Sequence, residues 1–310
     1  MTSAPILALF RSGADRDRWS PVLAALPAPC RTMHRLTGDD LTAGDAPRLA
    51  IVSAAAYAAA PHLSAALRSR HPAAELLLLA ADGEQPPLHR LFDDRIRHLV
   101  INPDGGGAAH ADELRLFRLA VEKLLRGESW QVGDYLQPGA AVFEFPLSCS
   151  CQKEEIIDRL ERLIPDSADA GSLRQRAALL ADELLENAMF GAPRDPNGTA
   201  LFRKGTDRPI GPEEAIRFRF GLDDRTLAME VEDGWGSLAP EEVLAHLAKN
   251  EARQLLEPTA GGRGLFIIWR FLDRLHVTIT PGRQTVIGGQ IRLGEPLTER
   301  PPRGFHISAH

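Results

Sequence analysis

The stretch Glu183-Leu-Leu-Glu-Asn187-Ala188 is the most informative in this chain, because it places a carboxylate and an amide one helical turn apart. We predict a helix over residues 173–190, with Glu183 and Asn187 at its edge. An amide oxygen suits a hard cation such as Mg²⁺, and a nearby carboxylate can polarise a water or a hydroxyl. Read alone, such a pair is more often a solvated helix edge. The apolar face of this helix follows the 3.6-residue period through Ala177, Leu180, Ala181, Leu184 and Ala188.

A second motif, Asp233-Gly-Trp-Gly236, follows a predicted strand over residues 226–232. A carboxylate only accepts hydrogen bonds, so Asp233 at a strand end suits an exocyclic amine such as that of adenine. Gly234 and Gly236 would let the backbone approach a ring closely. Read alone, this motif is more often a plain turn.

A third motif, Thr259-Ala-Gly-Gly-Arg-Gly264, leads into a predicted helix over residues 264–272. A glycine-rich entry to a helix presents unpaired N–H groups and the positive end of the helix dipole to an anion, as a phosphate cradle does. A flexible hinge is the alternative. The loop lacks the Gly-Lys-Ser/Thr ending of a Walker loop, and the chain has no Gly-x-Gly-x-x-Gly unit after a strand.

In this order, and followed by Thr285 on a late strand, the three motifs resemble the Bergerat-fold ATPases, the superfamily of gyrase, heat-shock chaperone and histidine-kinase ATP domains. The resemblance covers about residues 143–293, and its compact order is most similar to the anti-sigma-factor serine kinases. It implies ATP and Mg²⁺ as cofactors, with Asn187 holding the metal and Glu183 acting as the base. It further implies adenine recognition by Asp233 beside Gly236, a water near Thr285, and phosphate cover by Gly262, Gly264 and Leu265.

The glycine motif departs from the Asp-x-Gly-x-Gly of that superfamily. Either Glu232 takes the place of the aspartate, or Asp233 is kept and the loop is one residue shorter. We favour Asp233, because the extra methylene of a glutamate would shift the acceptor relative to the ring.

The first part of the chain predicts a different architecture. Short apolar runs at residues 6–10, 48–52, 75–79 and 98–101 alternate with longer stretches of helical character, as in a doubly wound parallel sheet. The pattern resembles a response-regulator receiver that has lost its chemistry. Arg11-Ser12, Ser53, Ala80-Ala81 and Asn102-Pro103 stand where a receiver has its acidic pair, phospho-accepting aspartate, hydroxyl and Lys-Pro. By this analogy it is a pseudo-receiver for docking, dimerisation or conformational relay.

We therefore predict a pseudo-receiver over residues 1–130, a Bergerat-fold α/β sandwich over residues 139–296 and a C-terminal tail over residues 297–310. The polar stretch at 127–138 reads as a break between the domains. The elements expected in the sandwich are a strand at 141–146, helices at 153–164 and 173–190, strands at 215–221 and 226–232 joined as a hairpin, helices at 240–249 and 264–272, and strands at 275–280 and 285–293.

Composition limits the function classes. The 310 residues are 44% hydrophobic and 25% charged, as in a globular protein, and the net charge of -6 argues against a generic nucleic-acid binder. No apolar run or leader pattern predicts membrane insertion or export, so we expect a cytoplasmic protein. Of three cysteines, Cys149 and Cys151 are expected to be thiols on the same face of a strand.

The resemblance implies a signalling regulator that transfers the γ-phosphoryl group of ATP to a Ser or Thr of a partner protein. The partner would be an anti-anti-sigma-like protein, a sigma factor or a receiver, and a homodimer is compatible with this function. A histidine kinase is disfavoured, because residues 126–143 cannot hold a phospho-accepting helical hairpin. Two alternatives stay open: a nucleotide-gated interaction module without phosphoryl transfer, and a retained fold that binds no nucleotide.

Overall fold

The chain is described here by a computed structural model, which divides into two compact units. The first comprises residues 1–129 and 303–305, and the second residues 130–302 and 306–310. Gly262 of the predicted phosphate loop lies outside the described residues. The structure describes residues 6–34, 47–81, 83–84, 86–102, 108–166, 170–195, 197–252, 263–293 and 304–310.

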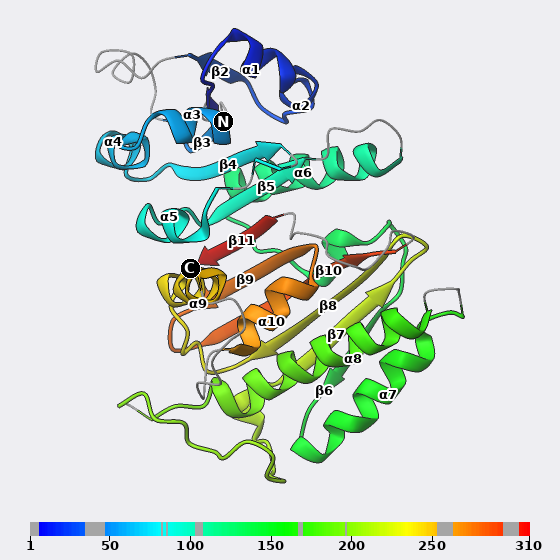
Figure 1. The fold of residues 1–310 in the computed structure, drawn as a ribbon. Helices are drawn as coiled ribbons and strands as arrows, with labels where there is room; N and C mark the ends of the chain where they lie inside the picture. Colours follow the sequence, from blue (N-terminus) through cyan, green and yellow to red (C-terminus); the bar gives the residue numbers. More distant parts are fainter. Residues whose placement is uncertain are drawn as a thin grey trace. The chain divides into compact units, whose positions relative to one another are not determined.

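The first unit contains a parallel sheet with the strand order β2-β1-β3-β4-β5 (Figure 1). Both β1 and β3 are buried along their whole length, and successive residues of a strand point to opposite faces, so the sheet is covered on both sides. The predicted α/β architecture with a parallel sheet is thus confirmed. Its strands are β1 (Ile6–Leu9), β2 (Cys30–Met33), β3 (Leu49–Ser53), β4 (Glu75–Ala81) and β5 (His98–Asn102). Its helices are α1 (Gly13–Arg18), α2 (Ser20–Ala24), α3 (Ala54–Ala59), α4 (Leu63–Arg70), α5 (Leu88–Asp93) and α6 (Ala108–Arg126).

The carboxyl ends of β1 and β3 carry a hydroxyl–carboxylate pair. Ser53 caps α3 by accepting a hydrogen bond from the Ala56 N–H, and its own hydroxyl donates to Asp15 Oδ2 at 2.5 Å. Asp15 also accepts from the Arg11 N–H at 2.8 Å. Asp15 lies in the first turn of α1, and its carboxylate links the ends of the two strands.

The second unit contains an antiparallel sheet with the order β9-β10-β8-β7-β6. Its strands are β6 (Val142–Pro146), β7 (Arg217–Leu222), β8 (Thr226–Asp233), β9 (Arg274–Thr280) and β10 (Gln284–Arg292). Its helices are α7 (Lys153–Leu163), α8 (Ala170–Glu186), α9 (Pro240–Ala252) and α10 (Arg263–Phe271). These elements match the predicted order, including the β7–β8 hairpin.

Two further segments differ from expectation. Strand β11 (Gly304–Ala309) lies beside β9, so these residues of the predicted tail are part of a sheet. The expected break at 127–138 contains a structured turn, η1 (Val132–Tyr135), in which Tyr135 stacks on Trp130 with ring centroids 5.1 Å apart. Polar composition concealed this segment, because the backbone N–H of Val132 is satisfied by a distant side chain, Glu230.

Aromatic contacts show which face of this sheet carries the helices. The guanidinium of Arg159, on α7, lies over the ring of Phe145 at 5.1 Å. Phe145 pairs across strands with Phe218, and Phe218 pairs with Val231 on β8. Directly opposite residues point to the same face, so Phe145, Phe218 and Val231 mark the side covered by the helices, as Figure 1 shows for α7 and α8.

Cys149 and Cys151 also differ from the predicted pair of strand thiols. They flank Ser150 at a short 3-10 turn, η2 (Ser150–Gln152), and are joined by a disulfide. A change of backbone from extended to 3-10 brings the two sulfur atoms together. Within the described residues, none of the helices combines the length and apolarity needed to cross a bilayer.

Candidate functional site

Asn187 begins a π-helical turn, η3 (Asn187–Gly191), at the end of α8. The Ala192 N–H donates to the Asn187 carbonyl at 2.7 Å, five residues back, which is the hydrogen bond that defines a π-turn. Glu183 lies one turn earlier, and both side chains are half-buried. Such turns are frequent at functional sites, because the extra residue changes the direction of nearby side chains.

The first turn of α10 lies directly against this pair. A Cβ atom placed on Gly264 would lie 2.6 Å from Glu183 Oε2 and 3.0 Å from Asn187 Oδ1. At these distances an added Cβ would force the Glu183 and Asn187 side chains to shift, so glycine allows the closest approach. The structure therefore brings together three predicted site residues from the first and third motifs, and places the N-terminus of a helix beside a carboxylate and an amide. The neighbouring Leu265 is buried.

Asp233 and Thr285 are brought together at the other motif. They are directly opposite each other on the paired strands β8 and β10. Asp233 is two residues after Val231, so its side chain points to the helix-covered face of the sheet, and Thr285 points the same way. Because η3 and α8 both contact β8, these two side chains share a face with Glu183 and Asn187.

Burial dominates the electrostatics of Asp233, which is only 3% exposed. Desolvation raises its pKa to about 6, although hydrogen bonds from the Trp235 and Gly236 N–H groups oppose this rise. The Trp235 N–H donates to Oδ1 at 2.9 Å. Within the described part of the chain, the Thr285 hydroxyl opposite is buried without a hydrogen-bond partner. A buried polar atom of this kind is costly unless a ligand or water satisfies it.

The glycines after Asp233 have structural reasons to be glycine. Gly236 has φ +55°, and a Cβ there would lie 2.3 Å from the Thr280 carbonyl in the β9–β10 turn. A Cβ on Gly234 would lie 2.7 Å from the Glu213 carbonyl. The close approach that these glycines allow is thus to neighbouring backbone, and the predicted contact of Gly236 with a ring stays a prediction.

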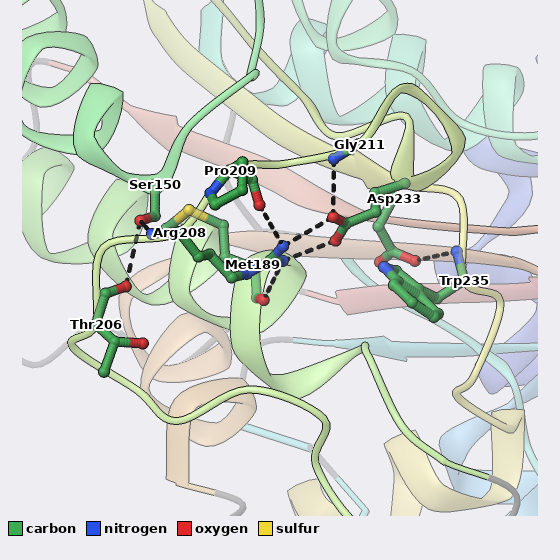
Figure 2. A network of polar contacts seen from close by, with 9 residues as sticks. Ser150, Met189, Thr206, Arg208, Pro209, Gly211, Asp233 and Trp235 are labelled. Atoms are coloured by element: carbon green, nitrogen blue, oxygen red, sulfur yellow. Dashed lines mark hydrogen bonds and ion pairs between the residues drawn. The ribbon is translucent and has the colours of Figure 1, made fainter.

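Figure 2 shows a buried network that sequence reasoning missed, which we call the Arg208 clamp: Ser150, Arg208, Glu214 and the Met189 carbonyl. Arg208 donates to both carboxylate oxygens of Glu214, at 2.8 and 2.7 Å, and to the Met189 carbonyl at 2.6 Å. Met189 belongs to the π-turn that begins at Asn187. The Glu214 carbonyl in turn accepts from the Gly234 N–H at 2.6 Å, so the clamp joins the turn of Asn187 to the end of β8.

The Arg208 clamp contains a desolvated ion pair, with side-chain exposures of 7% for Arg208 and 6% for Glu214. Burial alone would raise the pKa of Glu214, but hydrogen bonds from Arg208 and the Gly211 N–H bring that pKa below its ordinary value. The guanidinium also lies 3.8 Å from the ring centroid of Phe202. The sequence around Arg208 and Glu214 has no pattern that marks a buried pair.

Among the residues described, no group of three or more His, Cys, Asp or Glu side chains is placed to hold a metal ion. Neither the known protein-family models nor the curated protein sequences match this chain. The candidate site thus rests on its own geometry: Glu183, Asn187 and Gly264 at one end, and Asp233 with Thr285 at the other.

Proposed function

We propose that the second unit binds Mg-ATP and that the protein is a signalling regulator that phosphorylates a Ser or Thr of a partner protein. The observation that carries the proposal is the contact of the first turn of α10 with Glu183 and Asn187. Helix N-termini bind phosphates through backbone N–H groups and the helix dipole. Here such an end lies beside an amide suited to a metal and a carboxylate suited to proton transfer.

The opposite end of the site supports recognition of adenine. The ionised Asp233 carboxylate accepts hydrogen bonds from the Trp235 and Gly236 N–H groups and still retains acceptor capacity for an exocyclic amine. The buried hydroxyl of Thr285 faces the same side and fits a role in holding a water or a ring nitrogen. A purine at one end and phosphates at the other would span the distance between β8 and α10.

The residues present fit a magnesium ion, although they form no complete cage. Mg²⁺ commonly takes one or two protein oxygens and completes its shell with waters and substrate phosphates. The Asn187 amide oxygen is such a ligand, and the π-turn that holds it is fixed through the Met189 carbonyl by Arg208. When bound, the metal would neutralise charge on the transferring phosphoryl group.

In this proposal the chain itself contributes positioning and one proton transfer. Glu183 would draw the proton from the attacking Ser or Thr hydroxyl. Asn187 and the N-terminus of α10, with Gly262, Gly264 and Leu265, would orient the phosphates. Glu183 and Asn187 are half-buried, so a partner hydroxyl can approach them from solvent.

The finer fold assignment belongs to the same proposal. The helix-covered antiparallel sheet, with its site on the helix side, is consistent with a Bergerat-fold domain similar to the anti-sigma serine kinases. The order β2-β1-β3-β4-β5 of the first unit is that of receiver-like doubly wound folds. A receiver would have a phospho-accepting aspartate at the position of Ser53, so we propose a pseudo-receiver that serves docking or relay.

Phosphoryl transfer is tested by incubating the protein with γ-labelled ATP, Mg²⁺ and an extract of its own cells. The wild type should label a partner protein, and Glu183→Gln should reduce labelling about 100-fold or more, the usual contribution of a general base. Glu186→Gln is the matched control, because Glu186 lies on the same helix but binds Lys153 at 3.0 Å. It should label the partner normally.

A nucleotide-gated interaction module is the second candidate. The shortened glycine motif and the absence of receiver chemistry at Ser53 favour it. In that case ATP would change partner binding without leaving a phosphate on the partner. Nucleotide-dependent capture of a partner, with no label on it and no effect of Glu183→Gln, would support the module and rule out the kinase.

A further inference from the structure

Cys149 and Cys151 are placed to be oxidised and reduced. They are joined by a disulfide across one intervening residue, and their Cα atoms are 5.2 Å apart. Cys151 is exposed and Cys149 half-buried, so a thiol or disulfide reagent in solution can reach the pair. The two sulfur atoms are thus close enough to bond and accessible enough for thiol–disulfide exchange.

This disulfide is a poor structural crosslink. A disulfide stabilises a fold mainly by closing a loop of the unfolded chain, and the effect grows with loop length. A loop with only Ser150 between its ends restricts the unfolded chain very little. The effect of the bond must therefore be local, on the backbone and side chain of Ser150.

Cys30 differs from the pair in its bonding and in its thiol pKa. It is not disulfide-bonded, and burial raises the pKa of its thiol to about 11, which keeps the reactive thiolate scarce. It therefore offers an internal reference for thiol chemistry in the same chain.

Ser150 connects the disulfide to the Arg208 clamp, as Figure 2 shows. Its N–H donates to the Arg208 carbonyl at 3.0 Å, and its hydroxyl accepts from the Arg208 N–H at 2.9 Å and donates to the Thr206 carbonyl at 3.3 Å. Cys149 also forms a β-bridge with Pro209. Three successive residues, Cys149 to Cys151, are thus bonded to each other or to the backbone that carries Arg208.

The clamp extends from there to the candidate site. The guanidinium of Arg208 holds the Met189 carbonyl in the π-turn of Asn187, at 2.6 Å. A shift of the Arg208 backbone would alter that bond, because the side chain is also fixed at both carboxylate oxygens of Glu214. The path from the disulfide to Asn187 runs along the chain from Cys149 and Cys151 to Ser150, through hydrogen bonds to Arg208 and from Arg208 to Met189, and along the chain to Asn187.

We propose that Cys149 and Cys151 form a reversible thiol–disulfide site, and that its oxidation state determines how rigidly the Arg208 clamp is held. In oxidation, the two thiols lose two protons and two electrons and form one S–S bond. A disulfide of the glutathione class accepts the two protons and the two electrons and becomes two thiols. Reduction by a dithiol reverses the exchange. In the reduced form Ser150 is no longer held within a disulfide-closed ring, and residues 187–195 and 197–211, which include the π-turn, become less ordered.

Amide hydrogen exchange of the full chain tests this proposal in buffers of oxidised glutathione and of a reducing dithiol. Reduction should speed exchange of peptides from residues 187–211 by about threefold or more, the effect expected of a local change in opening. Cys30→Ser should respond as the wild type does. A Cys149→Ser, Cys151→Ser double variant should exchange at the same rate in both buffers, and it also shows whether the fold survives without the disulfide.

Two results would overturn the proposal: peptide masses showing both thiols still reduced in oxidised glutathione, or equal exchange in both buffers. The consequence for the nucleotide site rests on the proposed function, but the exchange measurement does not. A redox response in a protein that binds no ATP would leave the thiol–disulfide site standing and remove the proposed function.

Discussion

Gly264→Ala separates the proposed function of the site from the stability of the fold. Gly264 is the second residue of α10, and the added Cβ would lie 2.6 Å from Glu183 Oε2 and 3.0 Å from Asn187 Oδ1. Both neighbours must move, and Glu183 can do so because its carboxylate ends a flexible side chain. The variant therefore displaces the two groups assigned to phosphate and metal binding without removing them.

The stability terms nearly cancel. Alanine is favoured over glycine in a helix by up to about 1 kcal/mol. Moving Glu183 to a poorer rotamer costs about 0.5–1.5 kcal/mol. The free energy of unfolding should thus stay within about 1 kcal/mol of the wild type. Losing a hydrogen bond to a charged phosphate costs about 1.5–3 kcal/mol, so the Kd for ATP should rise at least about tenfold.

Calorimetric titration with Mg-ATP and urea unfolding measure these two quantities. Gly171→Ala is the matched control, because Gly171 is the second residue of α8 and no atom lies within 4 Å of its added Cβ. It should bind ATP as the wild type does and gain up to about 1 kcal/mol of stability. If Gly264→Ala binds ATP with wild-type affinity, the first turn of α10 is not where the phosphates lie.

Three further predictions address the other end of the site and the clamp. Folding raises the Asp233 pKa from 3.8 to about 6, which means that the protonated carboxyl favours the folded state. Its contribution to the free energy of unfolding is therefore fully present below pH 3.8, the unfolded pKa, and is lost as pH rises through 6. Adenosine, which has no phosphate to titrate, should bind more weakly as pH falls below about 6, and Asp233→Asn should abolish this pH dependence. Thr285→Val removes a buried hydroxyl, so it should raise the melting temperature slightly while weakening adenosine binding about tenfold; unchanged affinity would exclude the hydroxyl from the site. Arg208→Met leaves the Glu214 carboxylate buried and should cost about 3–5 kcal/mol, whereas Arg208→Met with Glu214→Met should cost less in urea unfolding; additive losses would contradict the paired geometry.

Periodicity and motif order were enough to predict the elements that carry the site. The apolar face of α8 and the turn residues between β7 and β8 produced the correct helix and hairpin, because each follows from local backbone and packing rules. The strand β2 was missed. Its residues are only partly buried, so Cys30–Met33 shows no apolar run.

The missed parts of the site depend on contacts between distant residues. No sequence pattern marks Arg208 and Glu214 as a buried pair, and their hydrogen bonds to Met189 and Gly211 exist only in the folded chain. The approach of Gly264 to Asn187 likewise depends on the packing of α10 against α8. Sequence order could suggest that these motifs belong together, but only tertiary structure could show which of them touch.

The proposed site for Mg-ATP is formed by α8, β8 and α10, so both of its ends must contribute to nucleotide affinity. Calorimetry of the purified full chain with Mg²⁺ and a non-hydrolysable ATP analogue tests it most directly, with Asn187→Ala and Asp233→Asn as probes of the two ends. We expect the wild type to bind and each variant to lose at least about tenfold in affinity. Absence of binding by the wild type, or wild-type affinity in both variants, would contradict it.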